Sequence, residues 1–592
     1  MQVNKLFDDA KNLVEVFYNQ AILNPEKIAY EFARKKEPAI QRSYKEVLKR
    51  VSSIANFLSS RIDKPSNIAI ISSSRAEWME SDLAILANSS VTVHIYQTLP
   101  ASEIAYILDD AKVDTVFVEN LEQFEKIKTI NNNKFIIPTK DNLEKEVDLS
   151  IKTIISFENI NDSLTSLYNY NDLLDKTGKV FDFNSISIKR GDLANIVYTS
   201  GTTGVRKGVG QTHSNHLSNL RQAYVAQIYS SSDSILIFLP FAHSFAKLMG
   251  YIGMLTDVVL KFPSVSDSQT SKIDLELVGK DIAKMSASIV PVVPRFLDKV
   301  KEKLQLLSST ESFKSKILFK ALYSKNVLVR LLTFSIRAKI KKQVFGDNFK
   351  YAISGGAKLN PDTAYFFDNI NILILQGYGL TETCVATNVN PYFKNKIGTV
   401  GPLLDADIEL KISNESEILF RGPNVVNGYY NYKKATEESW DDDGFFHTGD
   451  LGSVDSDGYL SIVGRKKELI VSSYGKKISP IEVESFMEKS KFVSQSVLVG
   501  NDRKYCVALV VPELGLLEAE FEKGLKREEQ EDFIYNEIIV SCQKLAKFKV
   551  PKKIIIISDP FSVENGLLTP TLKIRRSHIE KAYQAKIDLL YK

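Results

Sequence analysis

The chain has 592 residues, of which 44% are hydrophobic and 25% are charged, and its formal net charge is +4. Because one hydrophobic core stops growing near ~250–300 residues, we expect a large composite region and at least one smaller domain. So small a net charge gives no indication of nucleic-acid binding, and the three widely spaced cysteines exclude a disulfide framework and a cysteine metal cluster.

The sequence also lacks the common signals for export and membrane insertion. No apolar run reaches the ~18–20 residues that a membrane-spanning helix needs. The first ten residues include Asp8 and Asp9 and do not form a signal-peptide pattern. We therefore expect a cytoplasmic protein.

The first part of the chain predicts alternating helices and strands. Ser43-x-x-Glu46 is a capping-box pattern, and apolar residues then recur at helical spacing up to residue 62. Strands are predicted at 67–71, 91–96 and 115–118, with helices at 78–86 and 102–108. Strands that alternate with helices of about ten residues are typical of βαβ units in a parallel sheet. Residues 130–190 are predicted to form irregular connections with short strands.

A loop rich in glycine and hydroxyl groups, YTSGTTGVRKG, follows a predicted strand at 195–197 and spans residues 198–208. Glycines allow backbone N–H groups to converge into an anion-binding nest, and the hydroxyls and Lys207 add further donors. Arg206 stands where a Walker loop would have its second glycine, so this is a different type of loop. We predict that it holds phosphates; a polar surface turn is the alternative.

Several later strands also end in polar or glycine-rich loops. Helices are predicted at 217–225 and within 272–305, where they flank a strand at 287–290. Further strands are predicted at 235–239, 351–354 and 372–375. The residues that follow them include His243, Gly355-Gly356 and Tyr378 to Glu382. In an open parallel sheet the carboxyl ends of strands line the ligand crevice, so we expect these loops to converge on one site.

The last third of the chain predicts two smaller units. Short strands and turns indicate a small β subdomain at about 400–464, and the charged run at 464–468 marks the predicted domain boundary. Residues 1–464 then form an α/β domain of βα-layered sheets, and 465–592 a smaller, mobile α+β domain. In the latter we predict strands at 495–499, 508–511 and 553–557 and a helix over 525–546.

Residues 312–345 carry nine Lys or Arg residues and no Asp or Glu. Leu328, Leu331, Leu332 and Ile336 give this segment an apolar helical face. One interpretation is a solvated helix on the surface. The other is peripheral docking on anionic lipid headgroups at the inner face of a membrane, worth roughly 1 kcal/mol for each cation near the surface.

Seven motifs, in order, resemble the core motifs of the adenylate-forming superfamily, which contains acyl-CoA synthetases, luciferases and peptide-synthetase adenylation domains. They are YTSGTTGVRKG (198–208), SGGAKL (354–359), QGYGLTET (376–383), FHTGDLG (446–452), GRKKELIV (464–471), GKKISPIEVE (475–484) and LTPTLKIRR (568–576). Residues 73–108 and the basic segment resemble the long-chain fatty acyl-CoA synthetase branch. The resemblance covers nearly the whole chain.

This resemblance implies a two-step ligase that uses ATP, Mg²⁺ and CoA. A fatty acid carboxylate attacks the α-phosphate of ATP, which gives acyl-AMP and pyrophosphate. The thiol of CoA then displaces AMP and forms acyl-CoA. The implied small-molecule partners are therefore a fatty acid, ATP and CoA.

The resemblance also implies roles for the residues around the phosphates. The residues that match the family's loop for the β- and γ-phosphates are Thr199, Ser200, Gly201, Thr202, Thr203, Gly204 and Lys207. Thr381 would contact the α-phosphate. Glu382, with Thr199, would hold the Mg²⁺ that bridges phosphate oxygens.

Further matched residues would surround the nucleoside and the reacting groups. Gly356, Ala357 and Tyr378 resemble the adenine pocket, and Asp450 would accept hydrogen bonds from the ribose hydroxyls with support from Arg465. Lys573 would lie over the α-phosphate and the carboxylate during adenylation. His243 would gate the acyl pocket and orient the carboxylate.

In this superfamily the C-terminal domain rotates between the two half-reactions. Lys467 matches the hinge position. The rotation would withdraw Lys573 and bring Gly475 and Lys476 to the pantetheine tunnel.

The residues alone leave other interpretations open. Glu382 is also suited to cap a helix, Asp450 to occupy a turn and His243 to be an ordinary half-buried histidine. Arg575 and Arg576 compete with Lys573 for its role.

The function also has alternatives. One is an acyl-AMP ligase that loads the phosphopantetheine of a carrier protein, or a CoA ligase for another carboxylic acid. Another is a non-catalytic protein that binds nucleotides or membranes. The chain departs from the family pattern at Arg206, where proline is usual, and at Ala246, where the long-chain branch commonly has glutamate.

Overall fold

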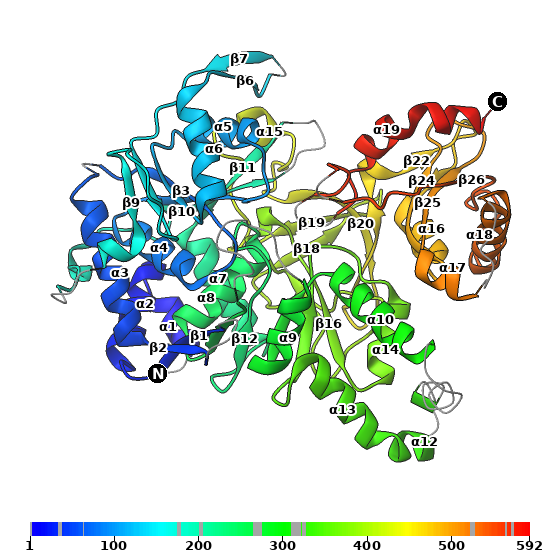
Figure 1. Cartoon of the computed structure of the whole chain (residues 1–592), viewed down its shortest axis with the longest axis horizontal. Coiled ribbons are helices and arrows are strands. Elements are labelled where there is room, and N and C mark those ends of the chain that lie inside the picture. The colour runs from blue at the N-terminus through cyan, green and yellow to red at the C-terminus, as the bar shows by residue number, and fades with distance from the viewer. Residues whose placement is uncertain are drawn as a thin grey trace.

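The computed structural model describes residues 3–33, 38–62, 64–141, 143–174, 179–199, 205–264, 275–309, 321–322, 327–520, 527–562, 565–569 and 573–591. A broad layered body contains the N-terminal two thirds of the chain, and a smaller unit, coloured orange to red, lies at one side of it (Figure 1). The mixed α/β class is confirmed, because parallel sheets dominate the large body.

A seven-stranded sheet contains the first predicted βαβ units. Its order is β11-β10-β4-β3-β5-β8-β9, and all neighbours are parallel except β10 and β11. Its strands are β3 (Asn67–Ile71), β4 (Val91–Ile95), β5 (Thr115–Val118), β8 (Thr153–Ser156), β9 (Leu167–Asn169), β10 (Leu193–Thr199) and β11 (Lys207–Thr212). The strands predicted at 67–71 and 115–118 are confirmed with the same bounds.

The helices of this region are α3 (Tyr44–Ser59), α4 (Ala76–Ala87), α5 (Ala101–Asp110) and α6 (Leu121–Asn132). The capping box of α3 is confirmed, since Ser43 accepts from the Glu46 backbone and its own backbone N–H donates to Glu46 Oε2 at 2.8 Å. The apolar face predicted from the 3.6-residue period of α3 is buried. A small hairpin of β6 (Phe135–Pro138) and β7 (Glu144–Val147) lies in the region predicted as irregular.

An eight-stranded sheet forms the second layer, in the order β17-β16-β15-β14-β12-β13-β1-β2. It is parallel except at its two edges, where β17 and β2 are antiparallel to their neighbours. Its strands are β1 (Ile28–Phe32), β2 (Ile40–Ser43), β12 (Ser234–Leu236), β13 (Val259–Phe262), β14 (Ile289–Val292), β15 (Tyr351–Ser354), β16 (Leu373–Tyr378) and β17 (Asn388–Val389). The strand predicted at 235–239 is shorter than expected, because it ends at Leu236.

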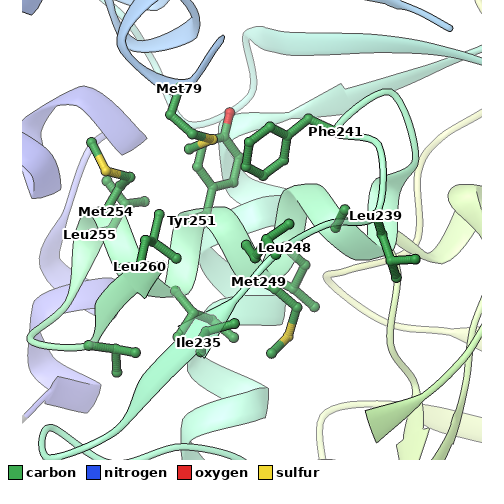
Figure 2. Close-up of a cluster of buried hydrophobic side chains, with 14 of the residues drawn as sticks. Met79, Ile235, Leu239, Phe241, Leu248, Met249, Tyr251, Met254, Leu255 and Leu260 are labelled. Atoms are coloured by element: carbon green, nitrogen blue, oxygen red, sulfur yellow. The ribbon is translucent and has the colours of Figure 1, made fainter. Parts of the chain in front are cut away.

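Helix α8 (Ser244–Leu255) lies in the core, and nearly all of its residues are buried. Figure 2 shows its side chains among those of neighbouring segments, including Met79, Ile235, Leu239, Phe241 and Leu260. The packing is close: a Cβ at Gly253 would lie 2.2 Å from Leu260 Cδ2. A helix that is buried on every side has little contrast between its faces, which is why no helix was predicted from this sequence.

The other elements of the large body cover these sheets or lie at their edges. They are α1 (Val3–Asp9), α2 (Leu13–Leu23), α7 (His213–Val225), α9 (Leu275–Met285), α10 (Pro294–Ser309), α12 (Val327–Leu332), α13 (Phe334–Phe345) and α14 (Pro361–Asn369), with the 3-10 turns η1 (Tyr170–Leu173), η2 (Phe183–Ser185) and η3 (Thr381–Thr383). Across the described residues, none of the helices combines the length and the apolar character that crossing a bilayer requires.

Two smaller units follow. The small β subdomain is an antiparallel sheet of β18 (Glu409–Ile412), β19 (Glu417–Arg421), β20 (Phe446–Val454) and β21 (Leu460–Arg465), and α15 (Lys433–Glu437) lies in the connection from β19 to β20. The C-terminal unit has η4 (Lys466–Glu468), the hairpin β22 (Ile470–Val471) and β23 (Lys477–Ile478), the sheet β24 (Val493–Val499), β25 (Val507–Pro512) and β26 (Ile554–Ile556), and α16 (Pro480–Met487), α17 (Leu514–Glu520), α18 (Arg527–Ser541) and α19 (Arg576–Leu589). The domain boundary at 464–465 stays a prediction.

Candidate active site

The predicted phosphate loop connects β10 to β11, whose end residues Thr199 and Lys207 are cross-strand partners. Five of the predicted phosphate-binding residues lie outside the described residues: Ser200, Gly201, Thr202, Thr203 and Gly204. The described ends of the loop form hydrogen bonds with residues of α5. Tyr198 donates from its hydroxyl to Asp110 Oδ2 at 2.7 Å, and Tyr106 donates to the Arg206 carbonyl at 2.9 Å.

The Arg206 side chain pairs with an acid of α5. Its Nε donates to Glu103 Oε2, on α5, at 2.7 Å. The Arg206 side chain is largely buried, with 14% of its surface exposed. The unusual arginine therefore holds the end of the loop against the body of the protein.

Lys207 and Glu382 meet at one aromatic side chain. Lys207 Nζ lies 4.6 Å from the ring centroid of Tyr429 and 5.8 Å from that of Tyr432. The Tyr429 hydroxyl donates to Glu382 Oε1 at 2.8 Å. Partial burial, followed by repulsion from Lys467, lowers the pKa of Lys207 below its usual value. The structure thus brings a predicted phosphate cation and the predicted metal carboxylate together.

The backbone of the segment that carries Thr381 and Glu382 is held by hydrogen bonds from two other segments. The Thr381 carbonyl accepts from Gln211 Nε2 at 2.9 Å, and the Glu382 carbonyl accepts from the Val426 backbone at 2.9 Å. Glu382 lies in the 3-10 turn η3, so its side chain is presented from a loop after β16. A helix-capping role for Glu382 is therefore not observed; its described partner is Tyr429.

Three of the predicted nucleoside residues, Tyr378 on β16 and Asp450 and Arg465 on the small β subdomain, form a second group. Asp450 is buried and is the cross-strand partner of Arg465, whose Nε donates to Asp450 Oδ1 at 2.8 Å. Tyr378 donates from its hydroxyl to Asp450 Oδ2 at 2.7 Å. Burial and the Asp450 carboxylate raise the pKa of Tyr378 far above its usual value, so this phenol stays protonated. Gly356 follows β15 with φ +82°, and Ala357 beside it is exposed.

His243 is the N-cap of α8, and its Nδ1 accepts from the Phe245 backbone at 3.2 Å. Burial, followed by the Lys573 charge, lowers the pKa of His243 to about 3. The neutral ring therefore carries its proton on Nε2, which faces Gly356: a Cβ there would lie 3.6 Å from Nε2. A neutral histidine with an outward N–H is a hydrogen-bond donor for an acid or phosphate oxygen.

Lys573 belongs to the C-terminal unit, and its charge acts on His243. The residue keeps an exposed surface, but protein atoms around the ammonium, followed by the Arg465 charge, lower the pKa of Lys573 to about 8. Asp450 and Glu382 act in the opposite direction, so all four charges lie within electrostatic range of one another. The Lys573 charge therefore acts on the predicted nucleoside residues Asp450 and Arg465 and on the predicted metal ligand Glu382.

The two residues predicted for the pantetheine tunnel lie elsewhere. Gly475, with φ +72°, forms the turn between β22 and β23 and donates to the Ser472 carbonyl at 2.8 Å. Lys476 Nζ lies 5.7 Å from the ring centroid of Phe548. These contacts belong to the C-terminal unit itself, and the role of both residues in a pantetheine tunnel stays a prediction.

The residues present fit a magnesium ion held partly by the nucleotide. Mg²⁺ is usually bound by one or two carboxylates together with substrate phosphates and water. Glu382 offers one carboxylate, with one oxygen fixed by Tyr429. Among the residues that the structure describes, no cluster of three or more His, Cys, Asp or Glu side chains could hold a metal ion without other ligands.

Two interacting residues were missed by the sequence analysis, Tyr429 and Glu103. Tyr429 belongs to the run Gly428-Tyr429-Tyr430, which has no charge or spacing that indicates a phosphate site. Glu103 looks like an ordinary first-turn acid of a helix. Only the contacts of their side chains reveal them.

Comparison with known proteins identifies the family of this chain. The model of the AMP-binding enzyme family matches residues 17–430, and that of the AMP-binding enzyme C-terminal domain matches residues 467–592. The chain therefore belongs to the AMP-binding enzyme family. It is an adenylate-forming, AMP-forming ligase that depends on ATP, with Mg²⁺ and CoA as the family's other cofactors.

Similar curated proteins include long-chain-fatty-acid–CoA ligase 5 of Rattus norvegicus, which is 28% identical over 99% of this chain and 89% of its own. Long chain acyl-CoA synthetase 8 of Arabidopsis thaliana is 29% identical over 93% of this chain and 82% of its own. Long-chain-fatty-acid–CoA ligase FadD15 of Mycobacterium tuberculosis is 28% identical over 88% of both chains.

Two solved structures share the fold. The adenylation domain of a carboxylate reductase from Mycobacterium chelonae has a TM-score of 0.80 and 19% identity, covering 100% of this chain and 92% of its own. ATP-bound MatB from Rhodopseudomonas palustris has a TM-score of 0.71 and 23% identity, covering 98% of this chain and 100% of its own.

Proposed function

We propose that the protein is an AMP-forming long-chain fatty acid–CoA ligase. The observation that carries this proposal is the buried Asp450 carboxylate, bound by Arg465 at 2.8 Å and by Tyr378 at 2.7 Å, with the Lys573 charge of the C-terminal unit acting within electrostatic range of it and of His243. Two anions must approach each other in the adenylation step, and such a site offers cations and donors for both. The names of the similar curated proteins support a long-chain fatty acid as the substrate.

In the first half-reaction, a carboxylate oxygen of the acid attacks the α-phosphorus of ATP. A new P–O bond forms, the bond to the β-phosphate oxygen breaks, and pyrophosphate leaves with the electron pair. We assign Lys573 and Thr381 to the α-phosphate charge, His243 Nε2–H to the incoming acid, and the Thr199–Lys207 loop to the pyrophosphate. A donor aimed at developing charge is worth roughly 3 kcal/mol, or about 10²–10³ in rate.

The remaining residues hold the nucleoside and the metal. In this proposal Asp450, held by Arg465 and Tyr378, receives the ribose hydroxyls, and Gly356 and Ala357 approach the adenine. Glu382, with Thr199, would hold Mg²⁺, which when bound neutralises charge on the phosphate oxygens.

In the second half-reaction the sulfur of CoA attacks the acyl carbon and AMP leaves with the C–O electron pair, while the thiol proton is released. We propose that residues 465–592 rotate about Lys467 and bring Gly475 and Lys476 to the pantetheine. This step distinguishes CoA from a carrier-protein acceptor. Supplying CoA or a phosphopantetheinylated carrier protein to enzyme-bound acyl-AMP tests it: we expect CoA to release AMP, and release only with the carrier protein would favour an acyl-AMP ligase.

Pyrophosphate release across unbranched acids from C4 to C18 tests the substrate class. Each buried methylene is worth ~0.8 kcal/mol, so we expect kcat/KM to rise over this series to a long-chain optimum. A Lys573→Met variant serves as the matched control for background hydrolysis. Release with aromatic or short acids alone would replace the long-chain assignment by another carboxylic acid ligase.

We also propose that α12 and α13 contact an anionic membrane surface from the cytoplasmic side. Leu331, Leu332 and Phe334 are 67%, 81% and 63% exposed, and the exposed face of α13 continues with Lys339 and Lys342, the latter paired with Asp347 at 2.9 Å. The surrounding segment carries nine cations and no acid, so a second copy of the chain would bring like charges together. Both helices lie at the lower edge of Figure 1, away from the C-terminal unit.

Sedimentation with lipid vesicles tests this contact. We expect the protein to pellet with vesicles that contain phosphatidylglycerol and not with phosphatidylcholine alone, and the binding to weaken with salt. A Leu331→Ser/Leu332→Ser variant should lose binding and keep pyrophosphate release. The proposal is wrong if the wild type and the Leu331→Ser/Leu332→Ser variant stay in the supernatant to the same extent. It is also wrong if analytical ultracentrifugation shows that the chain dimerises through this face.

A further inference from the structure

Tyr429 belongs to the segment that connects β19 to β20 along the chain. It contacts two residues that the proposed function assigns to the phosphates and the metal. Its hydroxyl donates to Glu382 Oε1 at 2.8 Å, and the face of its ring lies 4.6 Å from Lys207 Nζ. These two partners reach it from separate segments, η3 and the start of β11. One side chain therefore joins the carboxylate to the cation.

Tyr429 is itself held in place. Its backbone N–H donates to Thr436 Oγ1 at 2.9 Å, and its ring packs edge-on against Trp440 with centroids 5.5 Å apart. A backbone bridge joins it to Val209 on β11, two residues after Lys207. A side chain fixed in this way can impose a direction on the groups that contact it.

We propose that Tyr429 is a positioning residue for magnesium–ATP. By fixing one oxygen of Glu382, its hydroxyl sets the direction of the carboxylate and leaves the second oxygen for the metal. By stacking under the Lys207 ammonium, its ring limits the positions of a long and otherwise mobile cation beside the same carboxylate. Both groups are then ordered before the nucleotide binds, which removes part of the entropic cost of binding it.

The hydroxyl and the ring act on different partners, so substitutions separate them. Tyr429→Phe keeps the ring under Lys207 and removes the donor to Glu382. Tyr429→Leu removes both. Tyr432→Phe is the matched control, because the Tyr432 hydroxyl donates to the Lys140 carbonyl at 2.9 Å and its ring lies farther from Lys207, at 5.8 Å.

Calorimetric titration of ATP into the full-length protein, with Mg²⁺ or with EDTA, tests the proposal. Partners that orient a metal ligand typically change metal affinity by 10–100-fold. We expect Tyr429→Phe to weaken magnesium–ATP binding by about tenfold and to leave metal-free ATP binding within about twofold of the wild type. Tyr429→Leu should weaken metal-free binding as well, by about threefold, since the ring–cation contact is lost. Tyr432→Phe should match the wild type in both.

A double-mutant cycle distinguishes the loss of the Tyr429–Lys207 contact from a general loss of structure. In a Lys207→Met background, Tyr429→Leu should have no further effect on metal-free ATP binding, and ligand-free melting temperatures identify any misfolded variant. Equal magnesium–ATP affinity in wild type and Tyr429→Phe, or equal weakening with and without metal, would overturn the role of Tyr429. The titrations contain no acid or thiol, so they do not depend on the acyl substrate. A wild type that binds no ATP would instead overturn the proposed function, on which this inference rests.

Discussion

The Arg206 guanidinium donates from Nε to the Glu103 carboxylate at 2.7 Å, and so fastens the end of the phosphate loop to α5. The superfamily that this chain resembles usually has proline at this position, and proline restrains a loop by locking φ. Here a side-chain ion pair, together with the hydrogen bond from Tyr106 to the Arg206 carbonyl, restrains the same end of the loop.

Breaking this ion pair should weaken ATP binding more than folding. We expect Glu103→Gln and Arg206→Gln each to raise the KM for ATP about fivefold, because a partly buried pair of this kind is worth about 1 kcal/mol. The double variant should be no worse than either single one. Pyrophosphate exchange at varied ATP measures the effect, and additive losses would contradict a shared role.

Adenylation should depend on the protonation of Lys573. Protein atoms around the ammonium, followed by the Arg465 charge, lower the pKa of Lys573 to about 8, so the cation is mostly present at pH 7 and is lost as the pH rises. We expect kcat/KM for ATP in pyrophosphate exchange to fall above about pH 8, since this ratio reports groups of the free enzyme. Lys573→Arg should move that fall beyond pH 10.

The control for Lys573 is the second half-reaction. Lys573→Met should lose 10²–10³ in adenylation rate, on the order expected for one preorganised donor. It should transfer supplied acyl-AMP to CoA at about the wild-type rate. An equal loss in both half-reactions would indicate a structural role for Lys573.

The buried pair of Lys247 and Asp82 should contribute mainly to folding. Lys247 Nζ lies 2.6 Å from Asp82 Oδ1, the exposed fractions of the two side chains are 1% and 0%, and the ammonium lies 4.1 Å from the ring centroid of Trp78. Removing one partner leaves a buried charge, so we expect Asp82→Asn to lower the free energy of unfolding by about 3–5 kcal/mol. Urea unfolding measures this. Lys247→Met/Asp82→Leu should be less destabilised than Asp82→Asn.

Replacing Lys467 by proline should separate the two half-reactions. Lys467 lies in η4, directly after the last strand of the small β subdomain. A proline there restricts φ and hinders the proposed rotation. We expect Lys467→Pro to keep pyrophosphate exchange and to block thioester formation, and Lys467→Ala to keep both. Loss of both activities in the proline variant would count against a hinge at this residue.

Local patterns were sufficient wherever a single segment determines its own structure. The α3 capping box and the strands at 67–71 and 115–118 were predicted correctly, because caps and short apolar runs act over a few residues. Helix α8 gave no such pattern, because burial on all sides removes the contrast between its faces. The predicted roles of the site residues remain predictions that the experiments above address.

The sequence by itself determined the α/β class, the ordered motifs and the residue types available for phosphate, ribose and acid. It could not determine which side chains meet, because that depends on contacts between residues far apart in the chain. Only the tertiary structure places Tyr429 between Lys207 and Glu382, and Glu103 against Arg206. Such pairs form when two layers pack together, and their energies depend on distance and burial rather than on position in the sequence.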